Sequence, residues 1–248
     1  MAWLRRANEN NVDLNRNFLP EGEYHGAPSH YAMLDSFLNP KSEPSQDFFL
    51  LRAAALAVRY GMSTLTQAIA GGQYEYPKGL FFGGKKREEG VQKYYAFLSE
   101  HLPPAKRILA IDVHTGLGPF GQDSLAVERA DYEDLRRIFG SRIMLSEPKY
   151  GAAYRIRGGH QDLLSAAAAG KDIRFVTQEF GTYSPIKVLR ALREENRWHH
   201  HGGGTMDHPS KLGLKEIFCP QSEGWRTSAL ARGRDVVEKA LEALKAGG

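Results

Sequence analysis

Cysteine is almost absent from this chain, and long apolar runs are missing. The lone Cys219 excludes an internal disulfide, which makes the cytosol the favoured compartment. No apolar stretch approaches the roughly 18 to 20 residues that cross a bilayer. The start, residues 1–6, also lacks the hydrophobic core of a signal peptide. We therefore expect a cytoplasmic protein with no membrane partner.

Long blocks of like charge are missing as well. The formal net charge is +4, and acidic and basic residues alternate along the chain. Such a pattern indicates a mixed, solvated surface better than a nucleic-acid patch, so we expect no nucleic-acid partner. With 248 residues and 42% hydrophobic residues, the chain can bury a sizeable core.

What the sequence does contain is an alternation of helical and strand-like segments. Residues 47–60 predict a helix with Ser45 as its N-cap, and residues 86–101 predict a second helix. Residues 107–113 and 173–180 have the branched, apolar composition of buried strands. This alternation predicts a three-layer α/β/α fold with a mixed, largely parallel central sheet. Further helices are expected over residues 132–139, 160–169, 184–198 and 225–245.

Two segments have no regular period. Residues 1–28 predict an irregular loop, and residues 71–84 form a glycine-bracketed aromatic loop that either borders a site or is pinned to the core. Three consecutive histidines, His199, His200 and His201, fall at the expected end of a helix. Neighbours on a helix point about 100 degrees apart, so a structural role is favoured over one shared metal ion.

Three short motifs occur in a fixed order: residues 11–18 (NVDLNRNF), 112–118 (DVHTGLG) and 178–182 (QEFGT). Together they resemble the zinc carboxypeptidase superfamily, in the little-studied peptidase branch that contains these motifs. The resemblance extends over nearly the whole chain. It implies one carboxypeptidase-like α/β domain over residues 1–248 and a hydrolase that cleaves a peptide or acyl-amide bond next to a carboxylate.

The resemblance also implies roles for two polar residues near the ends of predicted strands. His114 resembles the third zinc ligand of the family, and Glu179 resembles its general base. Ligands bind at the carboxyl ends of strands in open α/β sheets, which is where both residues are expected. A functional role is favoured for Glu179, since a glutamate near the end of an apolar strand is costly to bury, and the alternative is a structural carboxylate that pairs with Arg16 or Arg155.

Four further residues match substrate-contacting positions of the family. Asn15 and Arg16 match the pair that holds the substrate carboxylate, and Arg6 matches the arginine that stabilises the oxyanion. Arg5 is an alternative to Arg6 for that role. Tyr154 resembles the tyrosine that caps the substrate. The expected substrate is a peptide or an N-acyl amino acid.

The family's H-x-x-E motif, which supplies two zinc ligands, is absent. None of the nine histidines has a glutamate three positions later. We therefore expect a chain that lacks its first strands or has lost its metal, with weak or absent zinc binding and impaired activity. An uncovered sheet edge would favour a homo-oligomer. The alternatives are a non-catalytic carboxylate-binding protein and an aspartoacylase-like deacylase.

Overall fold

The structure is a computed structural model that describes residues 4–146 and 156–246. It has the α/β fold predicted from the sequence, of the three-layer α/β/α class, with a mixed and mostly parallel sheet. The contacts divide the chain into two compact units, each built from three separate segments. Unit 1 comprises Met1–Phe97, Tyr154–Leu164 and Leu189–Lys215, and unit 2 comprises Leu98–Ala153, Ser165–Val188 and Glu216–Gly248.

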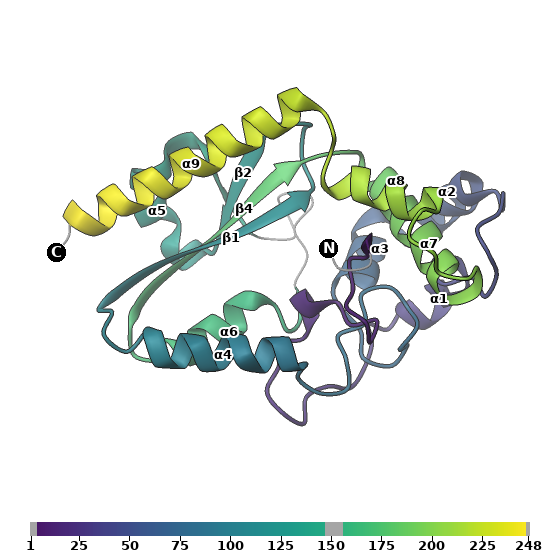
Figure 1. The fold of residues 1–248 in the computed structure, drawn as a ribbon, viewed down its shortest axis with the longest axis horizontal. Coiled ribbons are helices and arrows are strands. Elements are labelled where there is room, and N and C mark those ends of the chain that lie inside the picture. The colour runs from purple at the N-terminus through teal and green to yellow at the C-terminus, as the bar shows by residue number, and fades with distance from the viewer. Residues whose placement is uncertain (1–3, 147–155, 247–248) are drawn as a thin grey trace. The chain divides into compact units, whose positions relative to one another are not determined.

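Unit 2 contains a four-stranded sheet with the strand order β1-β4-β2-β3 (Figure 1). Strands β1 (Arg107–Gly116) and β4 (Asp172–Gly181) run parallel over ten paired residues. Strand β2 (Asp123–Val127) is antiparallel to β4 and parallel to β3 (Ile143–Leu145). The two predicted strands are confirmed, and β1 continues beyond residue 113 because its pairing with β4 extends to the end of both strands.

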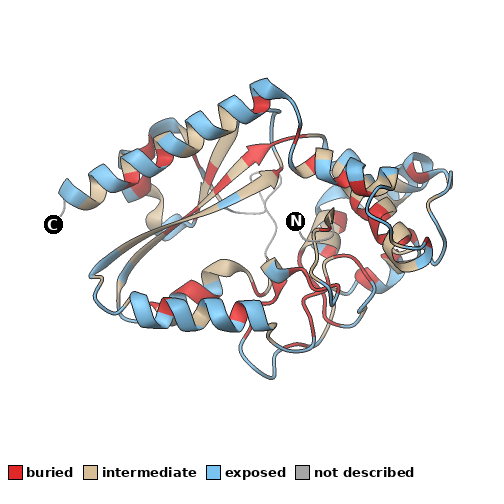
Figure 2. Cartoon of the chain, in the orientation of Figure 1, coloured by how far each residue is buried: buried red, intermediate tan, exposed pale blue. Residues whose placement is uncertain are grey.

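The core of unit 2 lies between the sheet and helices α5 (Tyr132–Phe139) and α9 (Glu223–Ala246). Figure 2 shows the buried residues along these elements. Both helices were predicted, α5 with the same bounds and α9 within two residues at each end. Their apolar stripes face the branched side chains of the strands, so burial holds the layers together. The buried members of this core are Leu125, Val127, Leu135, Phe139, Ile143, Val176, Val236 and Ala240.

Unit 1 has a core made by helices α1 (Tyr31–Leu38), α2 (Phe49–Tyr60) and α3 (Met62–Ala70). The predicted helix over residues 47–60 corresponds to α2. The main buried members of this core are Tyr31, Leu34, Phe37, Leu38, Phe49, Leu65 and Ala68. The remaining helices are α4 (Glu89–His101), α6 (His160–Ala167), α7 (Pro185–His201) and α8 (Pro209–Phe218), with short 3-10 turns η2 (Leu14–Arg16), η3 (Arg129–Asp131) and η4 (Gly140–Arg142).

The predicted N-cap of α2 is wrong. The helix begins at Phe49, and the residue before it, Phe48, has a left-handed backbone with φ of 54° and no capping side chain. Ser45 instead accepts a hydrogen bond through its Oγ from Arg197 Nη2 at 2.9 Å. Ser45, which the local pattern predicts as the cap of α2, therefore accepts a hydrogen bond from a buried arginine of helix α7 instead.

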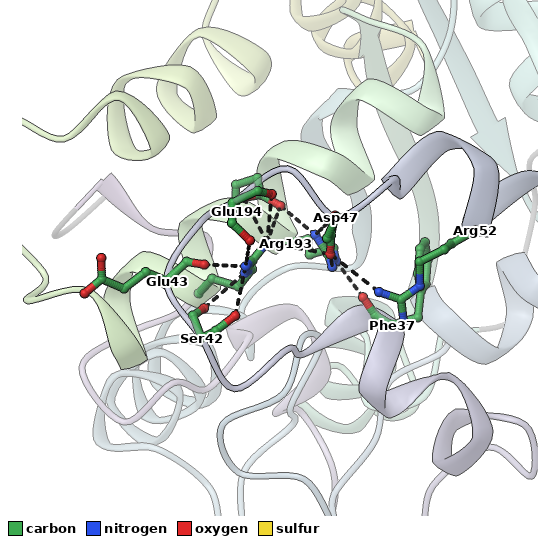
Figure 3. Close-up of polar contacts among 9 residues, drawn as sticks. Phe37, Ser42, Glu43, Asp47, Arg52, Arg193 and Glu194 are labelled. Atoms are coloured by element: carbon green, nitrogen blue, oxygen red, sulfur yellow. Dashed lines mark hydrogen bonds and ion pairs between the residues drawn. The ribbon is translucent and has the colours of Figure 1, made fainter.

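Two arginines of α7 hold the loop before α2 (Figure 3). Arg193 pairs with Asp47 and donates through Nε to the Phe37 carbonyl at 2.6 Å. Arg197 donates to the Ser42 carbonyl at 3.1 Å. Because both arginines are almost completely buried, these contacts satisfy donors that would otherwise be costly to bury.

The segments predicted to lack regular structure, residues 1–28 and 71–84, are irregular where the structure describes them. Apart from η2, the described part of residues 1–28 forms turns and extended backbone. The 71–84 loop is pinned to the core of unit 1, since Tyr74 is fully buried and its hydroxyl donates to the Arg16 carbonyl at 2.7 Å. Among the described residues, no helix combines the length and the apolar character that a bilayer crossing requires.

Candidate functional site

The parallel pairing of β1 and β4 brings His114 and Glu179 side by side in unit 2. The two residues are partners in the register of the strands, so their side chains point to the same face of the sheet. His114 Nδ1 lies 3.9 Å from Glu179 Oε2. Both side chains keep partial access to solvent, with exposed fractions of 23% and 18%.

Asp112 completes this arrangement from the same strand. Alternate residues of a strand share a face, and Asp112 Oδ2 lies 2.9 Å from His114 Nε2. The imidazole therefore has a carboxylate near each ring nitrogen. We call Asp112, His114 and Glu179 the His114 array.

The remaining oxygen of Glu179 is fixed by the turn after β1. Glu179 Oε1 accepts a hydrogen bond from the Leu117 backbone N–H at 2.9 Å. Gly116, with φ of 146°, shapes this turn, and a Cβ there would lie 3.5 Å from the same oxygen. A hydrogen bond from a backbone amide orients the carboxylate, so one of its oxygens is held while the other faces the imidazole.

The ends of the two strands are packed closely. A Cβ on Gly181 would lie far inside van der Waals distance of the Pro119 carbonyl oxygen, so only glycine fits there. Trp225 Nε1 donates to the Gly181 carbonyl at 2.8 Å. The backbone that carries the array is thus tightly packed.

Sequence reasoning singled out His114 and Glu179 but missed Asp112. A signal was available, because Asp112 stands two residues before His114 in a predicted strand and therefore on the same face.

Asn15 and Arg16 both lie in unit 1, within the 3-10 turn η2. Arg16 is fully buried, and its Nε and Nη2 donate to the Ala70 carbonyl at 3.1 and 2.6 Å. Its Nη1 donates to the Asn15 carbonyl at 2.8 Å. Backbone carbonyls therefore occupy donors that a substrate carboxylate would use. The predicted role of Asn15 and Arg16 in carboxylate binding stays a prediction.

Arg6 and Arg16 both lie close to Phe81 and Asp13 in unit 1. Arg6 Nε donates to Asp13 Oδ2 at 3.0 Å, and both arginines lie within about 6 Å of the Phe81 ring centroid, at 5.4 and 5.6 Å. Burial alone would raise the pKa of Asp13, but Arg6 and Arg16 outweigh it and lower that pKa. The structure therefore brings Arg6 and Arg16 together around one ionised carboxylate.

Arg5, the alternative to Arg6, is buried against α7. Its Nε donates to Glu195 Oε1 at 2.9 Å, and its Nη2 donates to the side chains of Asn11 and Asn196 at 2.8 and 3.1 Å. Tyr154, the predicted cap of the substrate, lies outside the described residues. The convergence of these unit 1 residues with His114 and Glu179 stays a prediction.

Unit 1 also contains a pocket of about 680 Å³, which is within the size range of small-molecule sites. It is lined by backbone from Gly26, Gly71 and Gly72 and by the side chains of Arg157 and Asp162, among others. Arg157 donates to two carbonyls of the 20–28 loop, so it holds one wall of the pocket in place.

The three consecutive histidines form the last turn of α7, as predicted. Burial is the main cause that lowers the pKa of His199 to about 4 and that of His200 to about 3, and the charge of Arg5 adds to it. Both rings are therefore neutral at pH 7. Across the described residues, no group of three His, Cys, Asp or Glu side chains is placed to hold a metal ion.

These features define an α/β protein with a histidine between two carboxylates at the carboxyl ends of two parallel strands. The chain belongs to the family described as "Protein of unknown function (DUF2817)", whose model matches residues 1–232. Comparisons with curated proteins and with solved structures found no match.

Proposed function

We propose that this protein is a carboxypeptidase-like hydrolase that cleaves a peptide or acyl-amide bond next to a carboxylate. The observation that supports this most is the adjacency of His114 and Glu179 at the ends of β1 and β4. The resemblance of the motifs assigns reacting groups to these two positions, and a position at the carboxyl ends of parallel strands suits ligand binding. The substrate would be a peptide or an N-acyl amino acid.

In this reaction, Glu179 takes a proton from a water molecule as the water oxygen attacks the carbonyl carbon. The carbon–nitrogen bond then breaks, and the proton passes from Glu179 to the leaving amine. The hydrogen bond from the Leu117 amide keeps Glu179 oriented, and Asp112 keeps the His114 imidazole oriented beside it. The roles of Arg6 in oxyanion stabilisation and of Asn15 and Arg16 in binding the substrate carboxylate are implied by the resemblance alone.

The resemblance implies a zinc ion, but the described residues do not supply a complete set of ligands for it. A catalytic zinc takes about three protein ligands and keeps one open position. His114 could supply one ligand, but both of its ring nitrogens lie near carboxylates and no group of three donors is present in the described part of the chain. These residues do not fit a complete zinc centre, and we assign no step to the metal.

The test is a hydrolysis assay on two substrate panels, dipeptides with a free carboxyl terminus and N-acyl amino acids. We expect weak turnover with at least one panel, and we expect Glu179→Gln to lower kcat by about 10²- to 10⁴-fold because it removes the general base. Glu128→Gln, which changes an exposed glutamate of unit 2, is the matched control and should keep full activity. Elemental analysis of the same samples reports the zinc content.

The two panels also separate the peptidase from an aspartoacylase-like deacylase, which would act on N-acyl amino acids alone. No turnover with either panel, with or without added zinc, would overturn the hydrolase proposal.

The rival function is non-catalytic carboxylate binding. The grouping of Arg6 and Arg16 around Asp13 supports it, because it places cations close together in unit 1. Calorimetry that shows binding of N-acetyl amino acids, without turnover and without any effect of Glu179→Gln, would favour this function. We further propose a cytoplasmic protein with no nucleic-acid or membrane partner, from the lone Cys219 and the mixed surface charge. The expected homo-oligomer stays a prediction.

A further inference from the structure

Helix α2 of unit 1 is apolar on two opposite faces. One face packs against the core of unit 1, and its members include Phe49, Ala53, Leu56 and Tyr60. A helix that covers a core in this way normally has polar residues on its other face. In α2, however, only Arg52 and Arg59 carry charge among twelve residues. The face that points away from the core is therefore apolar as well.

The outward face of α2 is made by Leu51, Ala54, Ala55 and Val58. These residues follow one another at steps of three, four and seven from the first, so they lie on one side of the helix. Leu51 is 70% exposed, Val58 is 89% exposed, and the side chains of both alanines are exposed too. We call these four residues the α2 stripe.

Three more large apolar side chains adjoin the stripe along the chain. Leu50 lies in the helix, Phe48 directly precedes it, and Met62 follows it after Gly61. All three are exposed to 60% or more. Single exposed apolar residues are normal on a protein surface, but a group of this size is typical of an interaction face.

The five large side chains offer enough area for a weak dimer. At about 150 Å² for each, which is the lower end for aromatic side chains, their exposed fractions amount to roughly 500 Å² on one copy. Two copies would then bury about 1,000 Å² together, which is close to the smallest area expected of a specific interface. The area therefore fits a weak association of two copies.

The order of side-chain sizes along the stripe fits a second copy of the same helix. It is large, small, small, large, so the stripe is symmetric about the midpoint between Ala54 and Ala55. When two α2 helices pack antiparallel about this midpoint, each Leu51 lies beside the Val58 of the other copy, and alanines face alanines. A two-fold interface places one patch against itself and needs such self-complementarity. The small central side chains allow the two helix axes to approach closely.

The two arginines of α2 flank this stripe on one side, because they are seven residues apart. Arg52 also pairs with Asp47 at 3.5 Å. In the antiparallel arrangement, the arginines of both copies lie along the same flank of the interface. Their repulsion opposes the association, so screening by salt should strengthen the dimer.

We infer that this protein forms a weak homodimer through the α2 stripe, with the two α2 helices antiparallel about a two-fold axis. This surface differs from the sheet edge for which the sequence predicted association. The dimer is independent of the proposed hydrolase activity, since no member of the His114 array belongs to α2.

Sedimentation equilibrium of the full chain over a series of protein concentrations tests the association. We expect a monomer–dimer equilibrium in the micromolar range that shifts toward the dimer as the salt concentration rises. A wild-type chain that remains monomeric up to millimolar concentration would overturn the inference and would leave the face to a different partner.

The variants Leu51→Arg and Val58→Arg add a cation to an interface that four arginines already flank. Because like charges across an interface repel, we expect each variant to weaken dimerisation by at least about tenfold. Both positions are exposed, so the fold should persist, and circular dichroism checks this. Leu212→Arg, at a 51% exposed position of α8 in unit 1, is the matched control and should keep the wild-type association. A dimer of unchanged affinity in both α2 variants would show that another surface associates.

Cysteine cross-linking locates the two-fold axis. In a Cys219→Ser background, Ala54→Cys places one thiol of each copy beside the axis, so mild oxidation should give a disulfide-linked dimer. Ala231→Cys, at an exposed position of α9, is the control and should stay monomeric on the same treatment. Equal cross-linking of the two variants, or none at residue 54 in a sample that is dimeric by sedimentation, would contradict the antiparallel arrangement.

Discussion

At the scale of single residues, the neutral histidines at the end of α7 make the stability of the protein depend on pH. Their folded-state pKa values, about 4 for His199 and about 3 for His200, lie below the ordinary value of 6.5. As the pH falls from 6.5 toward these lowered pKa values, the two histidines bind protons in the unfolded chain but not in the folded chain. The stabilisation is therefore complete above pH 6.5 and is lost progressively as the pH falls toward 4 and 3.

The variant His200→Gln removes one of the two groups, so we expect its unfolding free energy to fall less steeply than that of the wild type between pH 6.5 and pH 4.5. Urea denaturation at several pH values measures this slope. Equal slopes for His200→Gln and the wild type would show that His200 is protonated in the folded protein.

Part of the residue-scale picture could be predicted from the sequence. His114 and Glu179 were placed near strand ends because the apolar runs that precede them are easy to recognise. The partner of Arg16 could not be predicted, since the Ala70 carbonyl is 54 residues away and a backbone oxygen has no sequence signature. The partners of Arg5 could not be predicted either, because they depend on which acceptors the tertiary fold brings near.

At the scale of elements, sequence periodicity located the helices with a clear apolar repeat and missed elements in which that repeat is weak. Helix α5 matched its predicted bounds, although it has only eight residues, because its apolar positions repeat at helical spacing between charged residues. Strands β2 and β3, with five and three residues, are too short to show a period, and they were missed. Helices α1, α3 and α8 were also missed. Their apolar and charged positions are less sharply separated than those of α5, so tertiary packing determines them.

The junction between α2 and α3 allows a prediction about glycine. Gly61 ends α2 with φ of 78° and ψ of 149°, a conformation that is nearly exclusive to glycine. A Cβ at this position would meet no atom within 4 Å, so any cost of Gly61→Ala comes from the backbone alone. We expect this variant to lower the unfolding free energy by about 1–3 kcal/mol.

Gly213, inside α8, is the matched control for that variant. It also has open space around its Cβ position, but its backbone is helical. Gly213→Ala should therefore raise the unfolding free energy by about 0.4–1 kcal/mol. Urea denaturation of both variants measures the two effects, and a shift of the same sign in both would refute the backbone explanation.

At the scale of the whole molecule, the two compact units are interleaved along the chain. The limits of the units fall inside four helices, namely α4, α6, α7 and α8. A helix forms cooperatively along its length, so one that belongs partly to each unit couples their unfolding. The sequence could predict the α/β class but not this division, because periodicity shows where elements are and not which of them pack together.

We therefore expect a single unfolding transition for the whole chain. Leu34→Ala in the core of unit 1 and Leu125→Ala in the core of unit 2 should each lower the unfolding free energy by about 2–5 kcal/mol and shift the same transition. Differential scanning calorimetry with circular dichroism measures this. Two separate transitions, with each variant moving only one of them, would show that the units unfold independently.

The register of β1 with β4 has a consequence for altering this protein by design. His114 and Glu179 are neighbours because their strands pair directly, although 64 residues separate them in the chain. Exposed turns between the strands can therefore be varied without changing the spacing of the two side chains, as long as α5, which contributes Leu135 and Phe139 to the core of unit 2, is kept.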